Sequence, residues 1–276
     1  MSPPRASMGS QWFTRGIRSD PTIELTWALI LASARHIVTE SNSVRSGGWQ
    51  QTVGTDLRGK TLGVLGLGRI GSQVARVGSA FGMNLIAWSQ NMTPEAATAA
   101  GAILVSKDQL FERADILTIH LVLSSRTRGL VGAAELERMK PTARLINASR
   151  GPIVDEQALI SVLTNKQIAG AAIDVFDIEP LPPSHPFRTL DNVLATPHIG
   201  YVSAWSVQDV LRGYRLEYSA VARHPLVVEG DGGMGNDPSC VALALKVMED
   251  PNRSGGQAVW KPLVRGGPAG NSTWQE

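Results

Sequence analysis

Cysteine is almost absent from the sequence, in which Cys240 is the only example. A single cysteine excludes an intrachain disulfide and any metal cage built from several thiolates. Because stable disulfides are typical of oxidising compartments, we expect an intracellular protein of the reducing cytoplasm. We also predict that the protein holds no metal ion.

The sequence also lacks a hydrophobic run long enough to span a membrane. Its longest apolar stretch, residues 23–38, is interrupted by Glu24, Arg35 and His36, and we interpret it as a buried or interfacial helix. Neither sign of charge dominates, since 26 basic and 24 acidic residues are spread along the chain. Without a basic stripe or an apolar span, we expect neither a nucleic acid nor a membrane as a partner.

The sequence does contain a regular alternation of helix-like and strand-like segments. This alternation predicts an α/β fold with a doubly wound parallel sheet, covered by helices on both faces. With 276 residues and a 43% hydrophobic composition, the chain can bury one sizeable core of this kind. A first helix, capped by Asp20 and opening at Pro21, should end near Ser46. Further strands are expected at 61–65, 84–88, 103–105, 116–121, 144–148, 171–176 and 192–195, with helices at 70–81, 94–100, 107–113, 133–139 and 155–165.

Four regions follow one another along the chain. Residues 1–19 hold three arginines and no acid; a transit peptide has this composition, although we favour an irregular start. Residues 20–200 carry the alternating pattern and form the predicted Rossmann domain. At 201–228 the order degrades, with one more helix expected at 211–223. Residues 229–276 are rich in glycine, asparagine and serine, which is typical of a loosely ordered tail.

A glycine-rich turn lies between the strand expected at 61–65 and the helix after it. Gly66, Gly68 and Gly71 have the GxGxxG spacing, which supplies a tight bend, close backbone approach to a pyrophosphate and close packing of helix on strand. The start of the helix would direct free N–H groups and the positive end of its dipole at the phosphates. In this setting the motif predicts dinucleotide binding rather than a structural turn.

The residues after the second strand bear on the choice of dinucleotide. NAD-specific domains usually place an acidic residue there for the ribose hydroxyls, whereas this chain has Ser89, Gln90 and Asn91. These neutral side chains do not repel the 2′-phosphate of NADP, but they include no arginine that would bind it. We therefore expect NAD and leave NADP open. A dissociation constant for NADPH about tenfold below that for NADH would contradict this preference.

Three further motifs follow strands, at the edge of the sheet where such folds bind ligands. They are NASRG at 147–151, DVFDIEP at 174–180 and TPHIG at 196–200. Together with GLGRIG at 66–71, they resemble the D-isomer-specific 2-hydroxyacid dehydrogenase family, which includes phosphoglycerate dehydrogenases and glyoxylate or hydroxypyruvate reductases. The resemblance covers about residues 21–201. It implies an NAD(P)-dependent oxidoreductase that transfers a hydride between the cofactor and a 2-oxo acid or D-2-hydroxy acid.

The resemblance implies that Arg150, Glu179 and His198 form the catalytic set. A 2-oxo acid needs a fixed cation for its carboxylate, and the guanidinium of Arg150 offers a rigid fork. His198 would give a proton to the developing alkoxide as the hydride arrives, and would take it back in the reverse reaction. Glu179 would orient the imidazole and favour its charged form.

The same resemblance implies the cofactor contacts. Backbone groups of the glycine turn would meet the pyrophosphate, and Ser89 takes the ribose position. Val122, which stands where the family often has proline, and Thr127 would border the adenosine. Ala148 and Asp174 would meet the nicotinamide half, with Asp174 at the carboxamide. The full predicted cofactor set is Gly66, Gly68, Arg69, Ile70, Gly71, Ser89, Val122, Thr127, Ala148 and Asp174.

Both ends of the chain depart from the family pattern. Family members begin with a longer substrate-domain segment before the helix at Pro21, and their return to that domain is not recognisable beyond Gly200. We therefore expect only remnants of the smaller substrate domain beside the cofactor domain. Two functions stay open: a working oxidoreductase, or a catalytically weak or inactive NAD(P)-binding remnant or regulatory protein of the same family.

Formate dehydrogenase is a third alternative, since it shares the fold and the arginine and histidine positions. Glu179 disfavours it, because that enzyme has glutamine where hydroxyacid chemistry uses an acid. A formate oxidation assay separates the two activities.

A homodimer is also implied, because related proteins associate through the cofactor domain. The apolar helix at 23–38, with Trp27, is the expected contact. The expected small-molecule partner is a 2-oxo acid or 2-hydroxy acid, whose side chain the sequence does not reveal.

Overall fold

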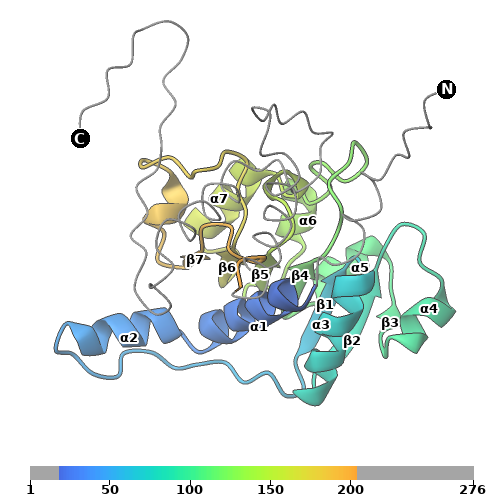
Figure 1. The fold of residues 1–276 in the computed structure, drawn as a ribbon, viewed down its shortest axis with the longest axis horizontal. Coiled ribbons are helices and arrows are strands. Elements are labelled where there is room, and N and C mark those ends of the chain that lie inside the picture. Colours follow the sequence, from blue (N-terminus) through green and yellow to red (C-terminus); the bar gives the residue numbers. More distant parts are fainter. Residues whose placement is uncertain (1–18, 204–276) are drawn as a thin grey trace, which may run out of the picture. The chain divides into compact units, whose positions relative to one another are not determined.

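Parallel strands form the central sheet of the protein. The computed structural model describes residues 19–203, which contain seven strands in the order β3-β2-β1-β4-β5-β6-β7 (Figure 1). All neighbouring strands pair in parallel, which confirms the doubly wound Rossmann-type α/β fold. The strand order reverses between β1 and β4, where such sheets bind ligands. The strands are β1 Thr61–Leu65, β2 Asn84–Trp88, β3 Ile103–Leu104, β4 Ile116–Ile119, β5 Arg144–Asn147, β6 Gly170–Ile173 and β7 Val193–Ala195.

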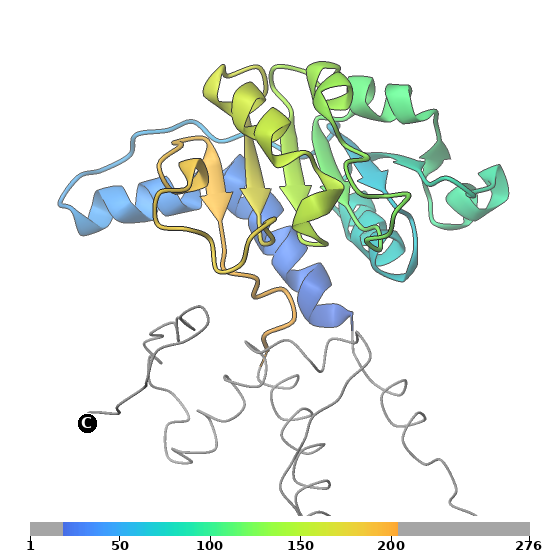
Figure 2. The ribbon, with the colours of Figure 1, turned by 90° about the horizontal axis from the view of Figure 1, so that it is seen from above.

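Helices cover both faces of this sheet (Figures 1 and 2). α1 and α3 pack on one face through a cluster that includes Ile30 and Val74. On the other face, α5, α6 and α7 pack through a cluster that includes Phe111, Leu136 and Leu163. The helices are α1 Asp20–Ala34, α2 Ile37–Arg45, α3 Arg69–Ala80, α4 Pro94–Ala99, α5 Lys107–Arg113, α6 Ala133–Glu137 and α7 Glu156–Thr164, with 3-10 turns η1 Gly151–Ile153 and η2 Pro186–Arg188.

Strand β1 shows why both faces must be covered. Leu62 and Val64 join the cluster under α1 and α3, whereas Leu65 joins the cluster under α5, α6 and α7. Successive side chains of a strand point to opposite faces of the sheet. An unbroken apolar strand is therefore buried only when helices lie on both sides.

The first helix differs from its prediction, because the single helix expected to run to Ser46 is two helices. The break falls after α1, where Arg35 ends the helix and His36 has a left-handed backbone with φ of 52°. A left-handed residue turns the chain out of the helical path. At the other end Ser19 occupies the cap position, and Asp20 lies in the first turn rather than capping the helix. α2 consequently extends beyond the β7 edge of the sheet (Figure 2).

Trp27, predicted as part of a contact with a second copy of the chain, is buried instead. Its side chain is only 6% exposed and its ring stacks on Phe81, with ring centroids 5.0 Å apart. Trp27 belongs to the protein's own core, because the apolar stripe of α1 faces the sheet. The strongly exposed apolar side chains at this end of the molecule lie instead in α2 and the segment after it, namely Ile37, Val38, Val44, Trp49 and Val53.

The expectations about the end of the chain, membrane spans and metal sites can be compared only with residues 19–203. The helix expected at 211–223 and the tail at 229–276 lie outside residues 19–203. Between residues 19 and 203, no helix is both long and apolar enough to cross a bilayer. The same residues contain no group of three or more histidine, cysteine or acidic side chains placed to hold a metal ion.

Candidate active site

The glycine turn joins β1 to α3 at the point where the strand order reverses. Gly66 has φ of +100°, and a Cβ there would lie 2.5 Å from the carbonyl oxygen of His120 on β4's side of the sheet. A Cβ on Gly71 would clash with the carbonyl oxygen of Gly66. These two positions require glycine, because the backbone is left-handed at the first and the helix packs directly on the turn at the second.

Gly68 has a different environment, which suits a ligand. A Cβ added there would meet nothing within 4 Å, and Gly68 caps α3 without any side-chain hydrogen bond. The first turn of a helix leaves its N–H groups without intrahelical acceptors and carries the positive end of the dipole. An open approach to free N–H groups, including those of Arg69 and Ile70, fits the pyrophosphate of a dinucleotide.

Ser89 lies beside this turn, directly after β2. Its hydroxyl oxygen accepts a hydrogen bond of 3.1 Å from the Leu67 N–H, which ties the end of β2 to the turn. Gln90 and Asn91, which follow it, are exposed and neutral. The structure thus places Ser89 next to the glycine turn. Its assignment to the ribose of the cofactor stays a prediction.

Val122 and Thr127 belong to the loop after β4. The Thr127 hydroxyl donates a hydrogen bond of 2.7 Å to the carbonyl of Val122 and accepts one of 2.8 Å from the Ser124 N–H. The Val122 side chain is 84% exposed. Thr127 therefore fixes the shape of the loop, and Val122 presents an apolar surface to the solvent.

Glu179 and His198 are brought together from different loops at the carboxyl edge of the sheet. His198 Nδ1 lies 2.6 Å from Glu179 Oε2, while Glu179 Oε1 accepts a hydrogen bond of 2.9 Å from the Phe176 N–H. The hydrogen bond with Glu179 is the largest cause that raises the pKa of His198. Burial lowers this pKa, the negative charges of Glu179 and Asp174 raise it, and the positive charge of Arg150 lowers it. The imidazolium is thus favoured at higher pH than for a free histidine.

Arg150 lies close enough for its charge to act on His198. One guanidinium nitrogen of Arg150 donates a hydrogen bond of 2.6 Å to the Ser149 carbonyl oxygen. The side-chain amide of Asn147 donates a hydrogen bond of 3.0 Å to the Arg150 carbonyl oxygen. No carboxylate of residues 19–203 forms an ion pair with Arg150. Its half-buried guanidinium is therefore available to an anion from outside the protein.

Asp174 has an environment that its predicted contact with the carboxamide does not explain. It is 0% exposed. Its carboxylate accepts hydrogen bonds of 2.6 Å from the Thr196 hydroxyl, 2.9 Å from the Ile199 N–H and 2.8 Å from the Gly200 N–H. Burial raises the pKa of Asp174, and these hydrogen bonds oppose the rise. The carboxylate clamps the turn that carries His198, and a contact with the carboxamide stays a prediction.

Thr196 is a residue of the site for which the sequence predicted no role. It stands in the TPHIG motif, two residues before His198, and its hydroxyl is held by Asp174. Only its place in that motif pointed to it. Ala148, expected at the nicotinamide, is 8% exposed at the end of β5 and packs in the cluster under α1 and α3.

Comparison with known proteins agrees with this geometry. Residues 27–200 match the family model of the D-isomer specific 2-hydroxyacid dehydrogenase, NAD binding domain. The chain is 43% identical over 228 residues to a glyoxylate reductase of Aeropyrum pernix, a match that covers 79% of this chain and 66% of that protein. It is 47% identical over 175 residues to a D-3-phosphoglycerate dehydrogenase of Synechocystis, covering 63% of this chain and 31% of the relative.

Solved structures are similar as well. A phosphoglycerate oxidoreductase from Vibrio cholerae is 36% identical with a TM-score of 0.68, covering 73% of this chain and 68% of that one. A D-lactate dehydrogenase from Aquifex aeolicus, complexed with NAD and lactic acid, is 26% identical with a TM-score of 0.66, covering 75% and 68%. The chain spans less than two thirds of the length of the curated relatives it matches. It belongs to the D-isomer specific 2-hydroxyacid dehydrogenase family, and residues 27–200 are its NAD-binding domain.

Proposed function

We propose that the protein is an oxidoreductase that transfers a hydride between NAD and a 2-oxo acid or its D-2-hydroxy acid. The observation that carries this proposal is the 2.6 Å contact between His198 Nδ1 and Glu179 Oε2. Arg150 lies close enough for its charge to act on His198, and its guanidinium forms no ion pair within residues 19–203. The relatives named as glyoxylate reductase and D-3-phosphoglycerate dehydrogenase support the same class of substrate. Glyoxylate, hydroxypyruvate and pyruvate are the first substrates to test.

The reaction assigns a separate task to each side chain. When bound, NADH supplies the hydride. Arg150 binds the substrate carboxylate through its guanidinium fork. The C=O π bond breaks as the carbon gains the hydride, and the oxygen takes a proton from His198 Nε2, because Nδ1 is engaged by Glu179. Glu179 holds the ring and stabilises its imidazolium form before the transfer. Oxidation of the hydroxy acid runs these steps in reverse.

The cofactor contacts are proposed as they were expected from the sequence. The open approach at Gly68 and the start of α3 support a pyrophosphate there, and the bond between Ser89 and the glycine turn supports the ribose position. NAD is the proposed physiological cofactor, and NADP stays open because Ser89 replaces the usual acid. The proposed set is Gly66, Gly68, Arg69, Ile70, Gly71, Ser89, Val122, Thr127, Ala148 and Asp174.

Arg150→Ala provides the test of the activity. The wild-type protein should consume NADH on addition of a 2-oxo acid, and the variant should lose about a hundredfold or more in kcat/KM because the carboxylate loses its charged partner. NADH binding, followed by fluorescence, should persist in the variant. Arg138→Ala is the matched control, since Arg138 forms only exposed ion pairs with Asp108 and Glu112. Absence of wild-type turnover despite NADH binding would contradict the enzyme and favour the non-catalytic alternative.

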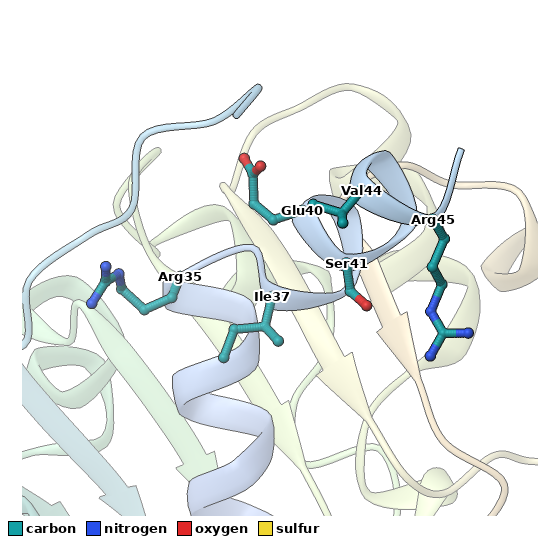
Figure 3. Close-up of a pocket in the computed structure, with 6 residues that line it drawn as sticks. All are labelled: Arg35, Ile37, Glu40, Ser41, Val44 and Arg45. Atoms are coloured by element: carbon teal, nitrogen blue, oxygen red, sulfur yellow. The ribbon is translucent and has the colours of Figure 1, made fainter. Parts of the chain in front are cut away.

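The proposed assembly is a homodimer formed through α2 and residues 46–56. Its support is exposed apolar surface, since Ile37, Val44, Trp49 and Val53 are 52%, 57%, 78% and 89% exposed. Grouped apolar side chains on a soluble domain mark association surfaces. Figure 3 shows Ile37 and Val44 at a surface hollow with charged neighbours that could orient a second copy; the hollow is lined by Arg35, Ile37, Glu40, Ser41, Val44 and Arg45.

The proposed domain boundaries are those expected from the sequence. Residues 20–200 form the cofactor domain. The other proposed regions, which are residues 1–19, the substrate-domain remnant at 201–228 and the tail at 229–276, lie almost wholly outside the described residues 19–203. The seven-stranded sheet within residues 19–203 supports the first of these assignments. Limited proteolysis should leave a protected fragment close to residues 20–200, and early cleavage inside that range would contradict it.

The proposed location is the cytoplasm. A chain whose only cysteine is Cys240 cannot depend on an internal disulfide, which suits a reducing compartment. Fractionation of cells that express the tagged full chain should recover it with cytoplasmic markers, and recovery in an organelle would contradict the proposal.

A further inference from the structure

A second histidine–glutamate pair lies outside the proposed reaction. His185 Nε2 is 3.1 Å from Glu156 Oε1, and the two side chains are only 12% and 17% exposed. Glu156 is the first residue of α7, and His185 directly precedes η2. Both side chains are therefore held at rigid elements, but neither has a part in substrate or cofactor binding as proposed above.

The hydrogen bonds of His185 determine its tautomer. The Phe187 N–H donates to His185 Nδ1 over 3.2 Å, so Nδ1 carries a lone pair rather than a proton. The ring proton is then on Nε2, from which it is donated to Glu156 Oε1. The Phe187 side chain is buried and its ring lies 4.8 Å from the imidazole. The imidazole is thus fixed in orientation, with a hydrogen-bond partner at each nitrogen.

Glu156 connects this pair to the catalytic glutamate through the backbone. Its second oxygen, Oε2, accepts a hydrogen bond of 3.3 Å from the Asp177 N–H. The preceding N–H, that of Phe176, donates to Glu179 Oε1, and Glu179 Oε2 reaches His198. Two consecutive peptide groups are therefore held by two different glutamates. A shift of the Asp177 peptide would move the Phe176 N–H that orients Glu179.

We propose that Glu156 and His185 are positioning residues, which fix the turn at 176–179 and so hold Glu179 against His198. His185 keeps one oxygen of Glu156 in place, and the other oxygen holds the Asp177 peptide. This inference rests on the proposed function, because it assigns the pair a role in the same reaction.

Glu156→Gln is the main test. A glutamine cannot accept from both donors, because one end of its amide is itself an NH₂ donor that would face either His185 or Asp177. His185→Asn is the second variant, since its amide oxygen can replace the Nδ1 acceptor while the side chain is too short to reach Glu156. Asp155→Ala is the matched control. Asp155 caps the same helix, α7, because its side chain accepts a hydrogen bond of 3.0 Å from the Ala158 N–H, and no hydrogen bond joins its carboxylate to residues 176–179.

Two measurements on the full chain distinguish a positioning role from a general structural one. Both test variants should lose about tenfold in kcat, with the KM of the 2-oxo acid and the Kd of NADH within about twofold of wild type. An NMR titration of His198 without substrate should show a lower pKa than in wild type, since Glu179 would be held less firmly. Asp155→Ala should reduce thermal stability yet leave the His198 titration unchanged.

The outcomes separate this inference from the proposed function. An unchanged His198 titration in both folded test variants would overturn the positioning role, as would an equal change in Asp155→Ala. Absence of turnover in the wild-type protein would instead count against the proposed function, and the NMR titration would still test the link from Glu156 to His198.

Discussion

At the scale of single residues, the buried carboxylate of Asp174 acts directly on the geometry of the site. It joins the end of β6 to the turn that carries His198, whose backbone is left-handed with φ of 52°. A non-glycine residue in this conformation is held there by its surroundings at some cost in free energy. The hydrogen bonds that Asp174 accepts are the surroundings that hold it.

Asp174→Asn should therefore disturb the turn that carries His198. One amide end would face an N–H or O–H donor, and we expect the free energy of unfolding to fall by about 1–3 kcal/mol. We also expect kcat to fall by about tenfold or more, because the proton donor is no longer held in place. Urea unfolding and steady-state kinetics measure the two effects.

The Kd of NADH is the discriminating quantity for this variant. If Asp174 only holds the turn, the Kd of NADH for the variant should lie within about twofold of wild type. If Asp174 also binds the carboxamide, loss of that hydrogen bond should raise the Kd by about tenfold at unchanged stability. The second result would support the proposed contact of Asp174 with the carboxamide of the cofactor.

Glu179 should set the pH range of the reaction. Its hydrogen bond raises the pKa of His198, so the imidazolium needed for reduction persists to higher pH and is lost as the pH rises through that pKa. In Glu179→Gln this pKa falls, and the alkaline decline of kcat/KM for reduction should move to lower pH. Oxidation needs the neutral ring and should gain at the lower pH values. Profiles that coincide with wild type would contradict the assigned role.

At the scale of elements, the positions of the strands were more predictable than their ends. β1 and β2 have the predicted bounds, whereas the strand expected to reach Leu121 ends at Ile119 and the one expected to reach Phe176 ends at Ile173. Apolar residues recur past both ends, at Leu121 and at Val175 and Phe176, but the ladder pairing of these strands stops at Ile119 and Ile173. Hydrophobic patterning carries no signal of where that pairing stops.

The end of α7 offers a stability prediction independent of the site. Lys166 follows the helix with φ of 54°; its N–H donates to the Leu163 carbonyl, and the Gln167 N–H donates to the Val162 carbonyl. This is a Schellman ending, whose left-handed position favours glycine. Lys166→Gly should raise the free energy of unfolding by about 1 kcal/mol.

Lys166→Ala is the control for this prediction. Alanine keeps the left-handed strain but removes the exposed contact of 3.6 Å with Asp191, which contributes little. Its stability should lie within about 0.5 kcal/mol of wild type in urea titrations. An equal gain in both variants would show that charge, rather than backbone conformation, limits the stability of this helix end.

At the scale of the whole molecule, the proposed dimer can be tested through α2. Light scattering should give twice the chain mass of 29.5 kDa. Ile37→Glu combined with Val44→Glu should yield a monomer with the same helical content, because both side chains are exposed and charge is poorly tolerated in an apolar contact. Glu112→Gln, on the far face of the sheet, is the control. A wild-type monomer would contradict the assembly.

The sequence by itself determined the fold class and the glycine turn, and the resemblance of its motifs to a known family named the catalytic candidates. The first two follow from short-range patterns, namely the strand and helix periods and the spacing of Gly66 to Gly71, and the three further motifs must lie at one edge once the strands are parallel. Each pattern is complete within a few residues of chain, so it can be read without knowing which segments become neighbours.

Only the tertiary structure decided the partners of the buried polar groups and the faces of the helices. It showed that Asp174 holds the His198 turn, that His185 reaches Glu156 from 29 residues away, and that Trp27 belongs to the core. Such pairings depend on which donors and acceptors meet within about 3 Å after packing. The same residues could have made other hydrogen bonds in other folds, and only the packed chain selects among them.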